Sequence, residues 1–359
     1  MFTLERRVEQ SKSWLVFSPI MAIGLTILSG IIIFSVLDKD PWMSLYTFFI
    51  QPLTTGFGVT ELIVKATPLI LIGVGLSIGF KANVWNIGAE GQFTMGAIAG
   101  GGTALFLNTQ ESFLVLPAVL LMGILGGVVW GMIPAFLKTK FNANEILTSL
   151  MLSYVALLIL SYLVHGPWRD PGGYNFPESE IFSDFAMLPI LLEGTRLNLG
   201  TGFALLSVLI IYILLSRTVL GYQFKVVGLA PAAAKHAGFD RAKLIWLSMI
   251  ISGGLAGLAG ISEVSGTIGQ LLPSVSPGYG FTAIIVAFLG RLNPVGVLFA
   301  GLIMALTYIG GENAQIEIGL PAAVTGLFQG IILFYLLACD VLARYRLRYK
   351  PFLKARDRE

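Results

Sequence analysis

The chain has 359 residues, of which 55% are hydrophobic and 12% are charged, and its formal net charge is +3 at pH 7. An ordinary soluble domain has about 25% charged residues, so this composition indicates a protein embedded in the lipid bilayer. The small net charge gives no reason to expect a nucleic-acid partner. A single cysteine, Cys339, excludes an internal disulfide, and two separated histidines, His165 and His236, argue against a zinc site.

Ten apolar stretches are long enough to cross roughly 30 Å of hydrocarbon as helices. The first is too long for a signal peptide and lacks a small-residue cleavage site, so we interpret it as a retained membrane helix. The eighth has the shortest apolar core, which follows glycine and proline. The sequence therefore predicts an all-α polytopic bundle of about ten transmembrane helices. The expected spans are 14–37, 62–80, 92–107, 113–137, 146–164, 199–215, 244–264, 276–290, 295–310 and 322–339.

Basic residues are unequally distributed between the two sides that ten spans create. An even number of spans places both termini on one side, and the positive-inside rule identifies that side as the cytoplasm. The basic residues expected on the opposite side are only Lys39, Lys65, Arg169 and Arg196. We therefore expect a cytoplasmic N-terminal segment at 1–13, a transmembrane domain at 14–343 and a basic cytoplasmic tail at 344–359.

Two long loops separate the predicted spans on opposite sides. The outer loop, 165–198, is rich in proline, glycine and aromatic residues, and it is either a connector or a docking surface for a partner outside the membrane. In the inner loop, 217–243, Pro231 suits the first turn of a short helix that Gly238 ends. This inner segment is either a linker or a small surface helix that fits a groove in a cytoplasmic partner.

A short internal repeat occurs at two places in the chain. Gly-Gln-Phe-Thr at 91–94 opens the third expected span, and Tyr-Gly-Phe-Thr at 279–282 opens the core of the eighth. Five spans separate the copies, so the two are expected to have opposite orientations in the membrane. Inverted repeats are common in transporters, and they place the transport pathway at the interface between the repeats.

Motifs of nucleotide hydrolysis and of common hydrolases are missing from the sequence. It contains no G-x-x-x-x-G-K-[ST], no H-E-x-x-H and no G-x-S-x-G. Carboxylates are almost absent from the expected spans, apart from Glu263 in the seventh, whereas an ion-coupled carrier usually needs an intramembrane Asp, Glu or His. We therefore predict that the chain is not an enzyme, has no catalytic residues, metal or cofactor, and obtains energy for transport from another protein.

The run Asn86-Ile-Gly-Ala-Glu-Gly-Gln92 is a polar cluster between two apolar segments, and such clusters near membrane depth indicate function. Three interpretations remain open. In the first, the run is a tight inner turn in which Asn86 and Glu90 cap helix ends. In the second, it is a broken helix that lines a substrate pathway, where Asn86, Glu90 and Gln92 contact polar hydroxyl groups.

Small residues define the third interpretation, in which Gly88, Gly91 and Gly96 allow helices to pack closely in lipid. Other polar residues near helix ends are candidates either for an outer gate or for surface capping. These residues are Glu263, Glu312 and Asn313. Asn144 and Glu145 are expected to cap the fifth helix from the cytoplasmic side.

Two motifs resemble those of one protein family. The run at 86–92 is similar to the N-I-G-x-E-G-Q signature of permeases from bacterial ATP-binding-cassette importers for branched-chain amino acids, simple sugars and nucleosides. The inner loop is similar to that family's R-T-x-x-G … G-x-N-P-x-A-A-x-x-A-G-I coupling segment, although Ala230 replaces the usual asparagine and Phe239 the usual isoleucine. The resemblance assigns ATPase coupling to Arg217, Thr218, Gly221, Gly228, Pro231, Ala233, Ala234, Ala237 and Gly238.

The resemblance implies a multi-pass permease subunit of the bacterial inner membrane that passes a small polar solute inward by alternating access. Its implied partners are a cytoplasmic ATP-binding subunit, a second permease subunit (a paralogue or a second copy) and an extracytoplasmic substrate-binding protein. The segments 142–154 and 166–168 are most similar to nucleoside-type members, which favours nucleosides or related purines as substrates. Simple sugars and then branched-chain amino acids are alternatives, and an ion-coupled secondary transporter is the alternative of another class.

Overall fold

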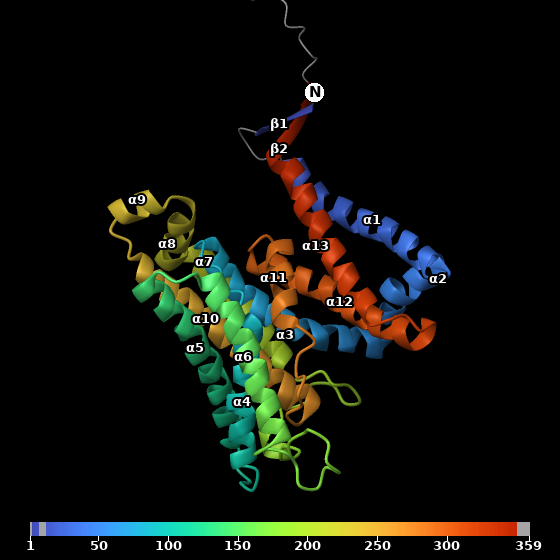
Figure 1. Cartoon of the computed structure of the whole chain (residues 1–359), viewed down its shortest axis with the longest axis vertical. Helices are drawn as coiled ribbons and strands as arrows, with labels where there is room; N and C mark the ends of the chain where they lie inside the picture. The colour runs from blue at the N-terminus through green and yellow to red at the C-terminus, as the bar shows by residue number, and fades with distance from the viewer. Residues whose placement is uncertain (1, 7–11, 350–359) are drawn as a thin grey trace, which may run out of the picture. The chain divides into compact units, whose positions relative to one another are not determined.

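Helices form most of the structure, a computed structural model that describes residues 2–6 and 12–349 (Figure 1). The longer helices are α1 (Lys12–Val36), α3 (Gly56–Lys81), α4 (Ala89–Phe106), α5 (Val115–Phe141), α6 (Glu145–His165), α7 (Gly200–Arg217), α10 (Arg241–Glu263), α12 (Pro294–Ile318) and α13 (Ala323–Arg344). The shorter helices are α2 (Pro41–Leu45), α8 (Val219–Leu229), α9 (Pro231–His236) and α11 (Tyr279–Leu289). The strands are β1 (Phe2–Arg6) and β2 (Tyr345–Tyr349).

Each of the ten stretches expected to cross the membrane is helical, which confirms the predicted helical class. Among the described residues, six helices are long and apolar enough to span a bilayer, namely α3, α5, α6, α7, α12 and α10 continued to Ile268. By contrast, α11 has only 11 residues, whereas about 20 are needed to cross the hydrocarbon. The crossing of the membrane by all ten helices and the side on which the termini lie stay predictions.

The two strands form a small sheet that the expected all-α class did not include. They are antiparallel, with Phe2 opposite Tyr349 and Arg6 opposite Tyr345. The Tyr-Arg-Leu-Arg-Tyr sequence of β2 alternates apolar or aromatic residues with charged ones, which is the period of a strand and could have predicted it. Of the predicted terminal segments, residues 1, 7–11 and 350–359 lie outside the described residues.

The chain divides into two compact units, which we describe separately. The terminal unit comprises Met1–Pro52 and Gly310–Glu359. Its core is aromatic, because the ring centroid of Phe328 lies 5.5 Å from that of Phe34 and 4.8 Å from that of Phe48. At its edge Lys39 Nζ donates a hydrogen bond to the carbonyl of Ile318 at the end of α12 (2.7 Å).

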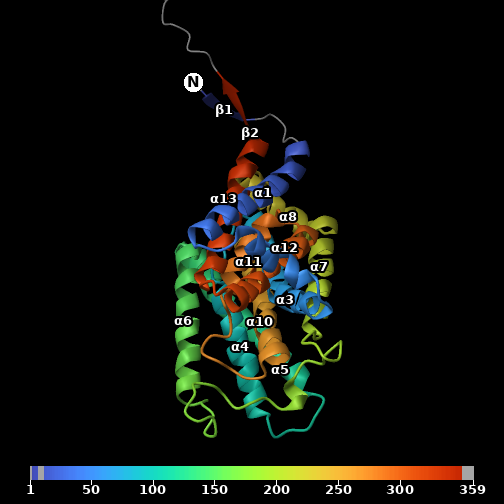
Figure 2. The ribbon, with the colours of Figure 1, turned by 90° about the vertical axis from the view of Figure 1, so that its right-hand side faces the viewer.

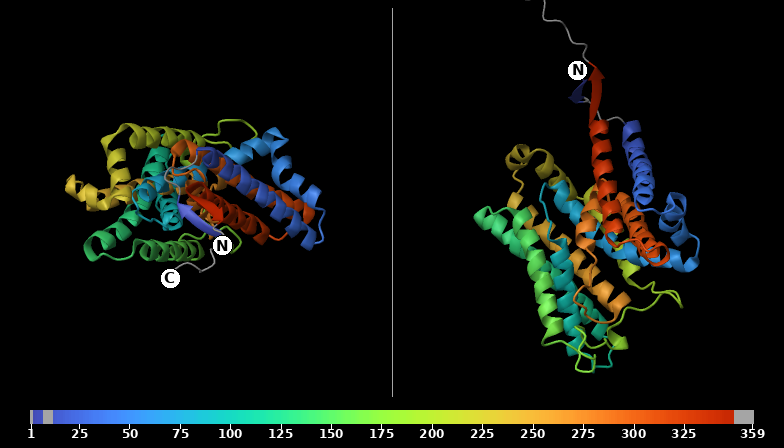
Figure 3. Two further views of the ribbon diagram at one scale, coloured as in Figure 1. Left: turned by 90° about the horizontal axis from the view of Figure 1, so that it is seen from above. Right: turned by 45° about the vertical axis from the view of Figure 1, so that its right-hand side comes forward.

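The central unit, Leu53–Ile309, is a helical bundle with α3 in its interior. In the most apolar stretch of α3 83% of residues are buried, against 22% in α5 and in α6, so α5 and α6 expose apolar surface of the kind that lipid covers. Figure 2 shows α6 beside α4 at the edge of this unit. Figure 3 shows α8 and α9 at one end of its helices and the loop 165–198 toward the other end.

Glycines allow α4, α5 and α10 to approach one another closely in the central unit. A Cβ atom on Gly127 of α5 would lie 2.7 Å from the Cα of Gly257 on α10, and one on Gly96 of α4 would lie 2.5 Å from the Gly257 carbonyl oxygen. Because side chains have no room at these points, the backbones themselves are in contact. Small residues at helix crossings are typical of membrane proteins, where they permit close van der Waals packing.

We expect Gly257→Ala to destabilise the protein by about 1–3 kcal/mol, the usual cost of overpacking, because its methyl group would overlap the backbone of α5. Gly202→Ala on α7 is the matched control, since the nearest atom to its added Cβ, a methyl carbon of Leu199, lies at an ordinary contact distance of 3.6 Å. Thermal unfolding of the purified proteins measures both effects. Equal melting temperatures for the two variants would contradict the role of this crossing.

Candidate functional site

The signature run lies in the connector between α3 and α4 and continues into the first turn of α4. Asn86, Glu90 and Gln92 are almost completely buried, with exposed fractions of 2%, 2% and 1%. Asn86 Nδ2 donates to Gln92 Oε1 (2.8 Å) and to Ser252 Oγ on α10 (2.9 Å), while Asn86 Oδ1 accepts from the backbone N–H of Gly88 (3.0 Å). The two amide side chains therefore join the connector to both α4 and α10.

Two serines of α6 hold the same run from its other side. Ser149 Oγ accepts a hydrogen bond from the backbone N–H of Ile87 (3.1 Å), and Ser153 Oγ accepts one from Gly91 (3.2 Å). A Cβ on Gly88 would lie 2.7 Å from the Ser149 carbonyl oxygen, and a Cβ on Gly91 would lie 2.7 Å from the Ser153 Cα. These hydrogen bonds therefore require glycine, because a side chain would separate the run from α6.

Glu90 connects the run to α11. Its Oε2 accepts a hydrogen bond from the backbone N–H of Gly280 (2.6 Å), in the first turn of α11. Ser276 Oγ accepts hydrogen bonds from the N–H groups of Gly278 (3.0 Å) and Tyr279 (2.9 Å). Side chains therefore provide acceptors for the backbone N–H groups at the start of this helix. A carboxylate is favourable there, because unpaired N–H groups give a helix N-terminus a partial positive charge.

The two copies of the sequence repeat lie against each other at this point. Gly91 and Gln92, in the first copy, follow Glu90 directly in α4. The N–H of Gly280, in the second copy, donates a hydrogen bond to the carboxylate of Glu90. The ring of Phe93, in the first copy, packs edge-on against that of Tyr279, in the second, at a centroid distance of 6.1 Å. The repeat therefore marks a contact between the starts of α4 and α11, while the opposite orientation of its copies stays a prediction.

These contacts bear on the three interpretations of the run. Asn86 accepts a hydrogen bond from Gly88, just before α4, and Glu90 accepts one from the first turn of α11, as the capping interpretation expects. The glycines of the run pack closely against neighbouring helices, as the packing interpretation expects. All three polar side chains have protein partners in this structure. Contact of Asn86, Glu90 or Gln92 with a solute stays a prediction.

A second polar group lies between α3, the segment before α7 and the end of α10. Arg196 donates through Nε to Glu61 Oε1 (3.0 Å) and through Nη2 to Oε2, so the pair is bidentate. Asn198 Oδ1 accepts from the N–H of Gly200 (2.9 Å), at the start of α7. Glu61 was not among the candidate residues because the predicted span began at residue 62, whereas α3 begins at Gly56.

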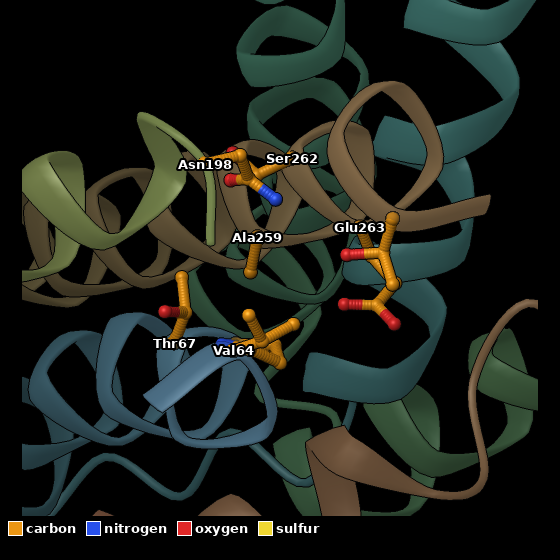
Figure 4. Close-up of a pocket in the computed structure, with 8 residues that line it drawn as sticks. Val64, Thr67, Asn198, Ala259, Ser262 and Glu263 are labelled. Carbon is orange, nitrogen blue, oxygen red and sulfur yellow. The ribbon is translucent and has the colours of Figure 1, made fainter. Parts of the chain in front are cut away.

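Glu263 lies at the end of α10, where the sequence placed it, and is 7% exposed. It lines a small cavity with Thr67, Asn198 and Ser262, which Figure 4 shows. Glu312 and Asn313, the other gate candidates, are on the part of α12 that belongs to the terminal unit; Glu312 is exposed and Asn313 is partly buried. The structure therefore does not place these two residues in one described site with Glu263.

The segment predicted to couple to an ATPase forms two helices. Arg217 ends α7, and Thr218 Oγ1 accepts from the N–H of Gly221 (3.2 Å) to cap α8. The predicted short helix is confirmed as α9, which Pro231 begins, and Gly238 follows it with a φ of +76°. Ala230, where the family has asparagine, makes no side-chain capping bond.

The surface of α9 is largely open. Pro231, Ala233, Ala237 and Gly238 are exposed, whereas Ala234 is buried at 2% exposure. Gly228, in α8, packs against the end of α3, since a Cβ there would lie 3.0 Å from the carbonyl carbon of Lys81. The coupling function of these residues stays a prediction.

Several residues of the polar network were not candidates in the sequence analysis. Ser149, Ser153 and Ser252 were missed because serines are common in apolar helices and their partners lie 62 to 166 positions away. The four-residue spacing of Ser149 and Ser153 on one helix face was the available signal. Asn144 was correctly predicted to cap α6, where it accepts from the N–H of Ile146 (2.9 Å), and Glu145 instead forms an ion pair with Lys138 (2.9 Å).

Apolar helices joined by a buried polar network define a protein that resides in the membrane. The family model described as "Branched-chain amino acid transport system / permease component" matches residues 58–337, so the chain belongs to this family of transporter permeases. As a permease of an ATP-binding-cassette transporter, it is not an enzyme, and a separate subunit hydrolyses ATP.

Three relatives cover most of the chain. The glucose ABC transporter permease protein TsgB13 of Haloferax volcanii is 36% identical over 93% of this chain and 90% of its own length. The nucleoside ABC transporter permease protein NupB of Lactococcus lactis is 28% identical over 91% of this chain and 92% of its own. The guanosine ABC transporter permease protein NupP of Bacillus subtilis is 32% identical over 81% of this chain and 82% of its own.

We expect Asn86→Ala to destabilise the protein, because it removes the partners of Gly88, Gln92 and Ser252, and an unsatisfied buried polar group costs about 1–3 kcal/mol. Asn313→Ala, at a partly buried asparagine of α12, is the control and is expected to change stability by less than about 0.5 kcal/mol. Thermal unfolding of the purified full chain measures both. A melting temperature for Asn86→Ala equal to that of the control would show that the network contributes little.

Proposed function

We propose that the chain is the membrane-spanning permease subunit of an ATP-driven importer that passes a small polar solute into the cytoplasm. The family match over residues 58–337 is the observation on which this rests. The sequence contains no phosphate loop, so the energy must come from the ATP-binding subunit. Alternating access then requires that the nucleotide-bound partner favour one state of the permease over the other, because only differential affinity shifts an equilibrium.

A nucleoside or related purine is the proposed solute. Segment 142–154, which resembles nucleoside-type permeases, supports it, as do the relatives from Lactococcus lactis and Bacillus subtilis, named for nucleosides and guanosine. The relative from Haloferax volcanii, named for glucose, supports a simple sugar as the alternative. Branched-chain amino acids are the least supported substrate class, since only the family description names them.

The proposed assembly places all ten long apolar stretches across the inner membrane of a bacterial cell, with both termini in the cytoplasm. Its other members are a second permease subunit, identical or paralogous, a cytoplasmic ATP-binding subunit and an extracytoplasmic substrate-binding protein. Affinity purification of the tagged chain from its native membrane tests this assembly. Recovery of an ATPase and a solute-binding protein supports it, and ligand screening of that binding protein identifies the solute. Ion-driven uptake by the isolated chain in liposomes would instead favour a secondary transporter.

The ATP-binding subunit is proposed to engage α9. This helix is exposed except at Ala234, and it borders a cleft of about 530 Å³ formed with α8 and the start of α10. Lys235, Asp240 and Arg241 line the cleft, and Asp240 caps α10 by accepting a hydrogen bond from the N–H of Lys243 (3.2 Å). The cleft and the exposed helix together offer both a projection and a recess to a cytoplasmic partner.

We expect Gly238→Val to weaken co-purification of the ATP-binding subunit and to uncouple ATP hydrolysis from uptake. Gly238 has a φ of +76° with open space around it, so valine strains only the backbone that ends α9. Gly319→Val is the matched control, because Gly319 also has a positive φ, +69°, and open space but follows α12 in the terminal unit. Retained coupling in Gly238→Val, or equal loss in both variants, would contradict the assignment of α9.

The loop 165–198 is proposed to receive the substrate-binding protein, and hydrogen bonds join it to the connector between α10 and α11. The N–H groups of Ser179, Phe182 and Leu188 donate to carbonyls of that connector, at 3.0, 2.9 and 2.8 Å. Ser179 Oγ also accepts from the N–H of Leu271 (2.9 Å), and Gln270 Nε2 donates to Glu178 Oε2 (2.9 Å). A partner bound to the loop would therefore act on the connector that leads to α11.

We expect Ser179→Ala to loosen this attachment, because the buried N–H of Leu271 loses its partner. Ser183→Ala is the matched control in the same loop, since Ser183 Oγ is buried without a hydrogen-bond partner among the described residues. Hydrogen exchange at the Leu271 amide should accelerate about five- to thirty-fold in Ser179→Ala, for a loss of roughly 1–2 kcal/mol, and stay unchanged in the control. Uptake stimulated by the binding protein should fall only in Ser179→Ala, and equal behaviour of the two variants would contradict the proposed link.

The pathway is proposed to pass Asn86, Glu90, Gln92 and Glu263. The contact between the two repeat copies, in which the ring of Phe93 packs against that of Tyr279, supports this, because transporters place their pathways at repeat interfaces. These side chains are buried and reach a solute only after neighbouring helices separate. A pathway residue changes the KM for uptake when substituted conservatively, as in Glu90→Gln, whereas a purely structural residue changes stability alone.

A further inference from the structure

A small cavity in the central unit is lined mainly by polar side chains from three parts of the chain (Figure 4). The lining residues are Val64, Thr67 and Pro68 of α3, Asn198 before α7, Ala259, Ser262 and Glu263 of α10, and Thr267. The centre of a water-sized sphere can occupy about 10 Å³ inside it. Roughly 10–15 Å³ by this measure is the space that one water molecule needs.

One hydroxyl group in the cavity wall has no hydrogen-bond partner among the described residues. Ser262 is 4% exposed, and its Oγ is buried without a partner. Another serine of α10 has a partner within its own helix, since Ser248 Oγ donates a hydrogen bond to the carbonyl of Ile245 (2.9 Å). A buried polar group left unpaired costs about 1–3 kcal/mol, so the cavity needs a polar occupant.

The other polar residues of the wall have capacity for a further hydrogen bond. Asn198 Nδ2 donates to the carbonyl of Arg196 (3.2 Å), and its second hydrogen is not used by that bond. The carboxylate of Glu263 can accept about four hydrogen bonds on its two oxygens. A water molecule typically makes about three hydrogen bonds in a buried site, and Ser262, Asn198 and Glu263 supply that number.

We propose that this cavity is a binding site for a single resident water molecule. The water accepts a hydrogen bond from Asn198 Nδ2, donates one to a carboxylate oxygen of Glu263, and either donates to or accepts from Ser262 Oγ. It fills the gap between α3 and the point where α10 changes into the π-helical turn Val264–Ile268. Because water can reorient its hydrogen bonds, this interface can shift without leaving a buried group unpaired, which a dry contact of fixed side chains cannot do. The inference does not depend on the proposed function.

X-ray footprinting of the purified full chain in lipid nanodiscs tests the site, because radicals formed from a bound water oxidise the side chains around it. Pro68 lines the cavity, and Pro134 of α5 is a matched control, since both are buried prolines inside long helices. We expect Pro68 to be oxidised at least several-fold faster than Pro134. Equal, slow oxidation of the two prolines would show a dry cavity and overturn the proposal.

A variant pair identifies what holds the water. Ser262→Ala should reduce the oxidation of Pro68 several-fold, because the water loses a partner, whereas Ser248→Ala on the same helix should leave it unchanged. Equal effects of the two variants would overturn the assignment to this cavity. Replacing sodium by choline in the buffer separates water from a bound cation: unchanged Pro68 oxidation supports water, and a change that depends on sodium overturns it.

Discussion

The central unit depends on the amide side chain of Asn86. Its nitrogen and its oxygen are both bonded inside the protein, and its partners lie on α4, on α10 and in the connector itself. A buried polar group that loses its partner in such a network destabilises the protein by about 1–3 kcal/mol, so every hydrogen bond favours the intact network. The helices around it must therefore meet at fixed positions, and the glycines at their crossings permit the close approach.

Both ends of the central unit for which a partner is proposed reach this network through short contacts. At one end α8 packs against Lys81 at the end of α3, five residues before Asn86 in the sequence. At the other end the connector from α10 leads to the start of α11, which Glu90 binds. The two contacts thus meet at neighbouring residues of one stretch of chain, Lys81 to Glu90. The family signature and the segment proposed to couple to the ATPase, which are far apart in the sequence, contact the same group of helices.

Sequence patterns predicted the helices, which depend on neighbouring residues, and missed the hydrogen bonds and ion pairs that join residues far apart in the chain. Apolar length located the ten helices, and proline and glycine located α9, because each signal is local. The ion pair of Arg196 with Glu61 joins residues 135 positions apart, and no local pattern identifies such a partner. The bonds of Ser149, Ser153 and Ser252 were missed for the same reason. The strand β2 was overlooked because the basic charge of its segment was interpreted as a tail, although its alternation was visible.

The short length of α11 has a consequence for the loop 165–198. A helix of 11 residues is about 16 Å long, roughly half of the hydrocarbon thickness. The membrane crossing proposed for α11 requires irregular backbone to complete that distance, and such backbone is tolerated at that depth only where protein shields it from lipid. The N–H groups of Ser179, Phe182 and Leu188 donate hydrogen bonds to carbonyls of this connector, so these carbonyls have partners within the protein. The loop 165–198 thus supplies hydrogen-bond donors that water would supply to an exposed segment of backbone.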